Sequence, residues 1–189
     1  MRIGIMGAGN VGRTLGEAWA NAGHEVRFGS RTPAGEASGT HAQVSEWADV
    51  VVFAVPGTVT AEVAQALGTT LDGKTVIDAS NRVGAATLNS VAEVSAAAPG
   101  ARVHRAFSTV GWEVMADPVF GDQRADLFYC GPEDDRDTLG TLIADVGFRA
   151  VWLGGPEEVE TVDGLARAWF ALALRRRMGR HVALRLLSE

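Results

Sequence analysis

Short apolar runs alternate with longer segments of helical periodicity along the whole chain. The apolar runs predict strands over residues 2–6, 25–29, 50–55, 75–77, 102–107, 127–130 and 149–153. The segments between them predict helices over residues 11–22, 61–67, 86–97 and 135–146, with a last, long helix over 157–187. This alternation is typical of an α/β protein whose doubly wound, mostly parallel sheet is covered by helices on both faces.

Three further segments bear on the architecture and the class of the protein. Residues 29–40 are rich in Ser, Thr, Pro and Gly and predict a loop at the carboxyl end of the second strand. The longest apolar stretch, residues 48–55, contains Asp49 and stops at Pro56, far short of the ~20 residues that cross a bilayer. The first residues do not resemble a signal peptide, because glycines interrupt the apolar run. We therefore expect a cytoplasmic protein without a membrane partner.

The composition supports one globular domain and excludes several kinds of partner. A chain of 189 residues with 47% hydrophobic residues has the size and the apolar content for a single core. With a net charge of −6, the chain lacks the basic surface that nucleic-acid binding requires, so nucleic acid is not expected as a partner. The one cysteine, Cys130, is expected to be a small buried hydrophobe. No metal site is predicted, because His24, His41 and His181 show no ligand spacing.

A glycine motif follows the first predicted strand directly. Residues 7–12 read Gly-Ala-Gly-Asn-Val-Gly, a G-x-G-x-x-G run that opens the first predicted helix. In this context Gly7 permits a tight turn, Gly9 lets the backbone approach a diphosphate, and Gly12 allows close packing of helix on strand. The amides at the helix start form a natural anion site. The motif therefore predicts a Rossmann-type dinucleotide-binding fold.

The residues after the second predicted strand favour NADP over NAD. An NAD site places a carboxylate there to bind the ribose 2′-hydroxyl. This chain has Ser30 and Arg31 instead, and a guanidinium binds a phosphate with two parallel hydrogen bonds. An exposed loop arginine without a ligand is the alternative reading of Arg31.

Residues at the ends of the next strands are expected to face the nicotinamide, because a dinucleotide lies across the carboxyl ends of the strands. They are residues 54–56, 79–82 and 107–111. Each of these residues could equally have a purely structural role: Pro56 could end a strand and Asn81 could cap a turn.

With these motifs in place, the sequence resembles the coenzyme F420-dependent NADP oxidoreductase family over nearly its full length. The resemblance rests on MRIGIMGAGNVG, GSR, ADVVVFAVP, GKTVIDASN, ARVHRAFSTVG, ADPVFG and GRHVALRLL. It implies hydride transfer between NADP(H) and a deazaflavin, coenzyme F420, by positioning alone and without catalytic side chains.

The resemblance also implies roles for particular residues. Gly7, Gly9, Asn10, Val11 and Gly12 would hold the diphosphate; Ser30 and Arg31 would hold the 2′-phosphate; Ala54, Val55, Pro56 and Asn81 would line the nicotinamide; and Phe107, Ser108, Thr109 and Val110, within residues 106–111, would line the substrate pocket. The family often has Thr-Asn-Pro and Phe-Asn-Thr where this chain has residues 80–82, Ser-Asn-Arg, and 107–109, Phe-Ser-Thr.

Other readings remain open. Reductases of other acceptors, such as flavins or ferric chelates, share the first half of the chain, and a non-catalytic NADP-binding sensor would keep the glycine motif and Arg31. His104 could donate a proton, Arg105 could offset substrate charge, and the arginines at 175–177 and 180 could meet an acidic tail or form a solvated face.

The chain is predicted to form one domain over residues 1–189. Residues 1–110 are expected to form the dinucleotide-binding core, and 111–189 an extension that completes the acceptor pocket. Related reductases with a separate helical substrate domain are longer than this chain. The partner is therefore expected to be a small redox co-substrate bound on the Rossmann face or at a homodimer interface that includes Trp169 and Phe170.

Overall fold

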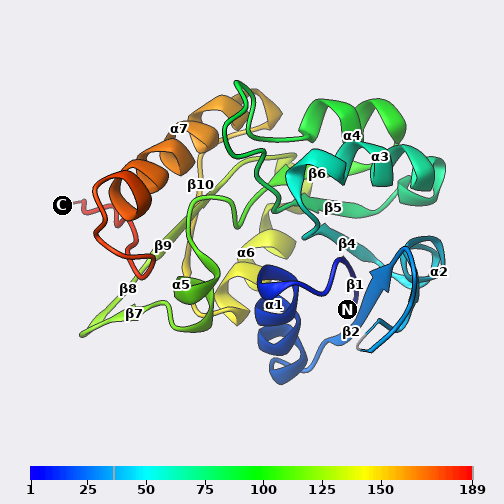
Figure 1. Cartoon of the computed structure of the whole chain (residues 1–189), viewed down its shortest axis with the longest axis horizontal. Helices are drawn as coiled ribbons and strands as arrows, with labels where there is room; N and C mark the ends of the chain where they lie inside the picture. The colour runs from blue at the N-terminus through cyan, green and yellow to red at the C-terminus, as the bar shows by residue number, and fades with distance from the viewer. Residues whose placement is uncertain (36, 189) are drawn as a thin grey trace.

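A six-stranded parallel sheet forms the centre of the molecule (Figure 1). The structure is a computed structural model and describes residues 1–35 and 37–188. The strands are β1 (Arg2–Met6), β2 (Glu25–Ser30), β3 (Gly39–Thr40), β4 (Val50–Phe53), β5 (Thr75–Asp78) and β6 (Arg102–Arg105), in the order β3-β2-β1-β4-β5-β6. The order reverses between β1 and β4, and ligands of such sheets bind at this reversal, outside the carboxyl ends of the strands.

Helices cover both faces of the sheet because the strands bury side chains on both. Ile3 and Ile5 of β1 belong to a cluster with helices α1 (Asn10–Asn21), α5 (Trp112–Ala116) and α6 (Arg136–Asp145). Val51 and Phe53 of β4 face α2 (His41–Trp47), α3 (Gly57–Leu67) and α4 (Val91–Ala97) on the other side. The predicted doubly wound α/β fold is confirmed.

A second, smaller unit follows the sheet. Strands β9 (Asp126–Tyr129) and β10 (Arg149–Trp152) pair in parallel, and β7 (Val119–Phe120) and β8 (Gln123–Arg124) form a short hairpin. One antiparallel bridge, between Arg105 and Cys130, joins β9 to β6. Helix α7 (Val159–Phe170) lies against β9 and buries Val162 and Ala166.

Most predicted elements are present, with corrections at their ends. The predicted loop over 29–40 contains β2's last residues and β3, and its residue 36 lies outside the described residues. Helices α2 and α5 and the β7–β8 hairpin were not predicted, because they are too short for a clear period. Helix α4 starts at Val91 rather than at 86, because Val91 N–H donates to Asn89 Oδ1 at 3.0 Å and residues 84–90 form an irregular loop.

The predicted C-terminal helix over 157–187 is wrong beyond residue 175. After α7 comes one π-helical segment, Ala171–Arg175, and the chain then turns at Arg177 (φ 56°) and Gly179 (φ 90°). The last residues run back along the molecule, where Trp169 Nε1 donates to the Val182 carbonyl (2.7 Å) and Leu186 N–H donates to Asp126 Oδ2 (2.6 Å). Tertiary hydrogen bonds therefore replace the helical ones.

Candidate functional site

The turn between β1 and α1 has the shape of a dinucleotide cradle. Gly7 has φ 109°, a conformation that favours glycine, and its N–H donates to the Gly29 carbonyl at 3.0 Å. A Cβ on Gly12 would lie 2.2 Å from the Gly7 carbonyl oxygen, whereas a Cβ on Gly9 would meet nothing within 4 Å. Gly9 caps α1 without a side-chain hydrogen bond. The first amides of α1 and an open face at Gly9 are therefore available to an anion.

A cavity of about 240 Å³ adjoins this turn at the carboxyl end of β2. Gly7, Ser30, Arg31 and His41 line it, together with Val55 and Pro56 after β4. Ser30 Oγ accepts from Thr32 N–H at 3.3 Å, so this hydroxyl is held in a local turn beside the exposed Arg31. Partial burial and the nearby Arg31 charge lower the pKa of His41, which favours the neutral form of its imidazole.

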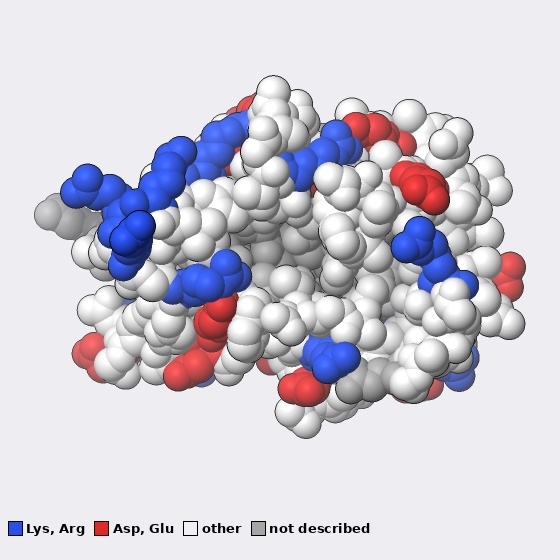
Figure 2. All heavy atoms as spheres, viewed as in Figure 1, with Lys and Arg blue, Asp and Glu red and all other residues white. Residues whose placement is uncertain are grey.

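A second cavity of about 250 Å³ continues from the first across Val55 and Pro56, which line both. Its wall is formed by one residue of α1, by residues that follow β4, β5 and β6, and by the C-terminal part of the chain: Val11, Ala54, Gly57, Ala79, Ser80, Asn81, Val83, Phe107, Val110, Gly111, Trp112, Trp169, Phe170, Leu174 and Arg180. Figure 2 shows a hollow in the middle of the face on which these carboxyl ends open. One continuous crevice therefore runs along the carboxyl edge of the sheet.

The structure brings most of the predicted site residues to this crevice. Gly7, Ser30 and Arg31 line the first cavity, Val11, Ala54, Asn81, Phe107 and Val110 line the second, and Val55 and Pro56 line both. Gly9, Asn10 and Gly12 lie in the turn at the start of α1. Ser108 and Thr109 are the exceptions: both are buried, neither lines the cavity, and Ser108 Oγ and Thr109 Oγ1 have no hydrogen-bond partner.

Phe107 occupies an unusual backbone conformation at the cavity wall. β6 ends at Arg105, two residues before the predicted end, and Phe107 has φ 58°, which is rare for a bulky side chain. Its ring packs edge-on against Trp19 of α1, with ring centroids 5.7 Å apart. Packing in the core therefore holds the backbone of the 107–111 loop in a turn that a continued strand would not make.

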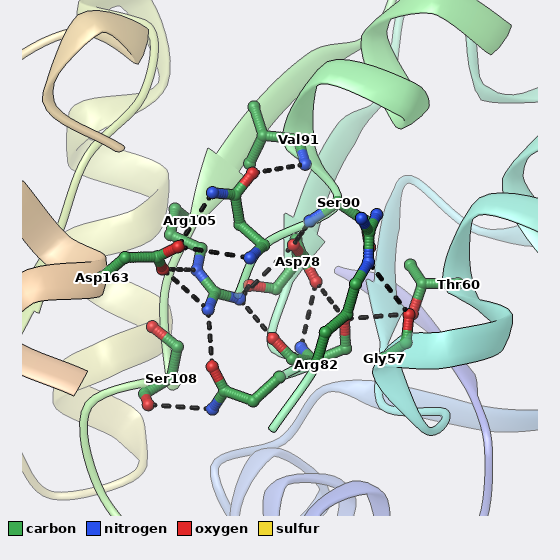
Figure 3. Close-up of polar contacts among 12 residues, drawn as sticks. Gly57, Thr60, Asp78, Arg82, Ser90, Val91, Arg105, Ser108 and Asp163 are labelled. Atoms are coloured by element: carbon green, nitrogen blue, oxygen red, sulfur yellow. Dashed lines mark hydrogen bonds and ion pairs between the residues drawn. The ribbon is translucent and has the colours of Figure 1, made fainter. Parts of the chain in front are cut away.

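Three buried charges lie behind the second cavity (Figure 3). Arg105 of β6 is 1% exposed, and its Nε donates to Asp163 Oδ1 of α7 at 2.9 Å. Its Nη1 lies 3.3 Å from Asp78 Oδ2 at the end of β5 and donates to the carbonyls of Asp78 and Ser80. The guanidinium of Arg105 is therefore buried, is paired with two carboxylates and lines neither cavity, where it could have offset substrate charge.

This ion cluster fixes the loop after β5. Asp78 accepts hydrogen bonds from Ser80 N–H (3.0 Å), Ser80 Oγ (2.6 Å) and Ser90 N–H (2.7 Å). Asn81 Oδ1 accepts from Arg105 Nη2 at 2.7 Å, and Asn81 Nδ2 donates to the Ser108 carbonyl at 3.0 Å. The loops after β5 and β6 are thus tied to each other at the cavity wall.

Sequence reasoning missed Asp78 and Asp163. A carboxylate that ends an apolar strand, as Asp78 does in TVID, is a signal of a buried partner. Asp163 gives no such signal, because a charged residue on an amphipathic helix is most often exposed.

His104 and Cys130 lie away from the crevice. His104 Nε2 lies 3.3 Å from Asp135 Oδ2, and the ring lines neither cavity, so it does not serve as a proton donor there. Burial lowers the pKa of His104, although hydrogen bonding to Asp135 opposes this. Cys130 is buried, as predicted, and burial raises the pKa of its thiol to about 12.

The tail arginines divide between two surfaces. Arg180 lines the second cavity, and its Nε donates to Glu113 Oε1. Arg175 lines a neighbouring apolar groove formed with Val83, Phe170 and Leu174.

Within the described residues, no helix is both long and apolar enough to span a bilayer, and no group of three or more His, Cys, Asp or Glu residues could hold a metal ion.

The family model described as NADP oxidoreductase, coenzyme F420-dependent, matches residues 2–82. The resemblance to this family is confirmed. The matched region contains the glycine turn, Ser30 and Arg31, which lie at the first cavity, and residues 54–56 and Asn81, which continue along the crevice into the second. The family is one of NADP-dependent oxidoreductases. No curated protein sequence matches the chain significantly.

Solved structures share the fold over all or nearly all of this chain. A protein from Arthrobacter sp. FB24, provisionally named an F420-dependent NADP-reductase, has a TM-score of 0.87 and 23% identity, with 100% of both chains covered. A hypothetical protein from Sinorhizobium meliloti has a TM-score of 0.68 and 28% identity, covering 100% of this chain and 96% of its own. The imine reductase of Streptomyces aurantiacus has a TM-score of 0.70 and 17% identity, and the match covers 92% of this chain and 63% of the reductase.

Proposed function

We propose that this protein is an oxidoreductase that transfers a hydride between NADP(H) and a flat deazaflavin-type coenzyme, such as F420. The observation that carries the proposal is the pair of cavities that join at Val55 and Pro56 along the carboxyl edge of the sheet. The first has the hydroxyl and guanidinium suited to a 2′-phosphate, and the second has room beyond the dinucleotide for part of a second ring system. The family match supports the NADP half of the proposal.

The chain supplies the binding groups that such a coenzyme needs. The space left open at Gly9 and the free start of α1 fit a diphosphate, since a Cβ at Gly9 would fill the approach. Arg31 and Ser30 bind the additional phosphate of NADP(H). Bound NADPH itself supplies the hydride.

The second cavity orients the reacting rings and excludes water. Ala54, Ala79 and Val110 are small apolar residues in its wall, and they allow two flat rings to stack closely. Holding the reacting carbons about 3–3.5 Å apart lowers the barrier through prepaid entropy, by up to several kcal/mol. The proton that completes reduction of the deazaflavin comes from solvent, so no side chain has to exchange a proton when the hydride moves, which agrees with the mostly apolar wall. Activity therefore depends on position rather than on an acid or a base.

Mixing experiments test the function directly. Purified protein is incubated anaerobically with NADPH and oxidised F420, and the absorbance of each is followed. Stoichiometric loss of both is expected, and Arg31→Ala should slow the reaction at low NADPH. If NADPH is oxidised with a flavin or a ferric chelate but not with F420, the acceptor is that flavin or chelate and not a deazaflavin. Tight NADP binding without turnover of any acceptor would identify a sensor.

We also propose a homodimer and a small-molecule redox partner. Trp169 is buried within its own chain and lines the cavity, so it has little surface left for a second copy. Phe170 is half-buried and lies beside the exposed Val83 and Leu174 in the apolar groove, which suits a subunit contact. Sedimentation velocity of the wild type and of Leu174→Glu tests this: the wild type should sediment as a dimer and the variant as a monomer.

A further inference from the structure

We infer that Arg105 is a positioning residue that makes Asn81 a hydrogen-bond donor toward the carboxamide oxygen of the nicotinamide. The inference rests on the proposed function, because it assumes that NADPH occupies the crevice. It assigns a role to the buried cluster of Arg105, Asp78 and Asp163, none of which lines the cavity.

The orientation of the Asn81 side chain follows from the chemistry of its partners. A guanidinium only donates, so the Asn81 atom 2.7 Å from Arg105 Nη2 has to be the amide oxygen. The Ser108 carbonyl only accepts, so the atom 3.0 Å from it has to be the amide nitrogen. Asn81 Oδ1 therefore accepts from the charged Arg105, and one of the two Nδ2 hydrogens is donated to the Ser108 carbonyl. The second N–H is what Asn81 can offer to a ligand in the cavity it lines.

Arg105 cannot turn away from Asn81 without leaving other charges unpaired. Nε donates to Asp163 Oδ1 at 2.9 Å, and Nη1 is occupied by the carboxylate and carbonyl of Asp78. Asp163 is itself held by the N–H and Nδ2 of Asn89, at 3.2 and 2.9 Å (Figure 3). Buried ion pairs are costly to break on one side. Helix α7, in the C-terminal part of the chain, therefore helps to set the direction of a side chain at the cofactor crevice.

The position of Asn81 selects the nicotinamide end of the coenzyme. The glycine turn and Arg31 lie at β1 and β2, and β4 and β5 follow on the other side of the reversal in strand order. A dinucleotide that crosses this reversal with its 2′-phosphate at Arg31 has its nicotinamide beside the residues after β4 and β5. There the carboxamide oxygen is the group that accepts a hydrogen bond.

Binding measurements with two ligands isolate this contact. NADPH has the nicotinamide, and 2′-phospho-ADP-ribose lacks it but keeps every group that the glycine turn and Arg31 would bind. Asn81→Asp keeps the acceptor for Arg105 and removes the donor. Arg105→Lys keeps the charge and removes the planar fork. Asp126→Asn is the control, because Asp126 of β9 is as buried as Arg105 and is paired with Arg149 of β10, away from the crevice.

We expect Asn81→Asp and Arg105→Lys to weaken NADPH binding about fivefold or more, and 2′-phospho-ADP-ribose binding less than about twofold. Asp126→Asn should leave the ratio of the two affinities unchanged. The reduced 3-acetylpyridine analogue of NADPH keeps the carbonyl and lacks the amide NH₂. It should bind the wild type about as NADPH does and lose the same factor in Asn81→Asp.

Other results overturn the inference in distinguishable ways. Equal losses for both ligands, or no loss with NADPH, would leave the proposed function standing and remove the role of Asn81 and Arg105. Escape of the acetylpyridine analogue from the loss would show that Asn81 does not donate to the carbonyl oxygen, and it would remove the proposed role of Asn81. Failure of wild-type protein to bind NADPH would end both proposals. If Arg105→Lys does not fold, Asn81→Asp decides the matter, since its side chain is half-buried and keeps the arginine contact.

Discussion

The glycines of the β1–α1 turn make a sharp prediction, because two of them are needed for different reasons. A methyl group at Gly12 would meet the Gly7 carbonyl oxygen at 2.2 Å, so Gly12→Ala has to move helix α1 away from β1. A methyl group at Gly9 would meet no protein atom within 4 Å, and Gly9 has φ −79°, which any residue adopts. Gly12→Ala should therefore destabilise the fold, whereas Gly9→Ala should affect only the binding of a ligand.

The magnitudes follow from these contacts. Inside a helix alanine is favoured over glycine by about 1 kcal/mol, and overpacking costs about 1–3 kcal/mol, so the net loss for Gly12→Ala lies between about 0 and 2 kcal/mol. Because the clashing atom is a backbone oxygen that cannot rotate away, we expect the upper half of this range, about 1–2 kcal/mol off the free energy of unfolding. For Gly9→Ala, the weaker N-cap and the lower entropy of the unfolded chain offset each other within about 0.5 kcal/mol. Its methyl group blocks the approach of the diphosphate, and we expect NADPH binding to weaken at least about tenfold.

Urea unfolding and NADPH titration of each variant separate the two effects. Gly140→Ala is the matched control: Gly140 lies in α6, a Cβ there meets nothing within 4 Å, and its change should add stability and leave NADPH affinity as it is. Wild-type NADPH affinity in Gly9→Ala would refute the reasoning, since the backbone at Gly9 would then not approach the diphosphate. A stable Gly12→Ala would contradict the steric argument.

Three further predictions concern single side chains. Arg31→Ala should weaken NADPH binding about tenfold or more and NADH binding hardly at all, as measured by fluorescence titration; equal losses would argue against a 2′-phosphate contact. Burial lowers the pKa of His104 below that of the unfolded chain, so the free energy of unfolding should fall as pH drops below about 6.5, and His104→Gln should reduce this slope, with His41 supplying part of the remainder. The buried Cys130 thiol, with its pKa near 12, should react with a thiol reagent only as fast as the protein opens; rapid reaction of the folded protein would place it at the surface.

Local sequence was sufficient wherever neighbouring residues decide the structure. The glycines of the β1–α1 turn lie within one short segment, and the packing of α1 on β1 depends on contacts inside that segment. The strands were found because a parallel sheet buries both faces and leaves continuous apolar runs. Ser30 and Arg31 could be assigned to the crevice because the carboxyl ends of parallel strands share one edge.

The predictions from sequence were wrong where the local pattern is compatible with two different backbone conformations. The apolar period after residue 157 suits a long helix, yet the chain leaves the helix near Arg177 and Gly179 and returns along β9. Residues 102–107 suit one strand, yet Phe107 turns with φ 58°. In both cases hydrogen bonds and packing with distant segments outweigh the local preference, which amounts to only a few tenths of a kcal/mol per residue, about 0.7 at most for ordinary residues.

The sequence by itself determined the doubly wound fold and the residues along the carboxyl edge of its sheet, because a strand, a glycine turn and a helix are specified by adjacent positions. Only the tertiary structure decided what Arg105 does. Its partners Asp78 and Asp163 lie 27 and 58 residues away along the chain, and no periodicity links such positions. A charge can be buried only where several distant groups meet it at once, so its place emerges when the strands and helices have packed.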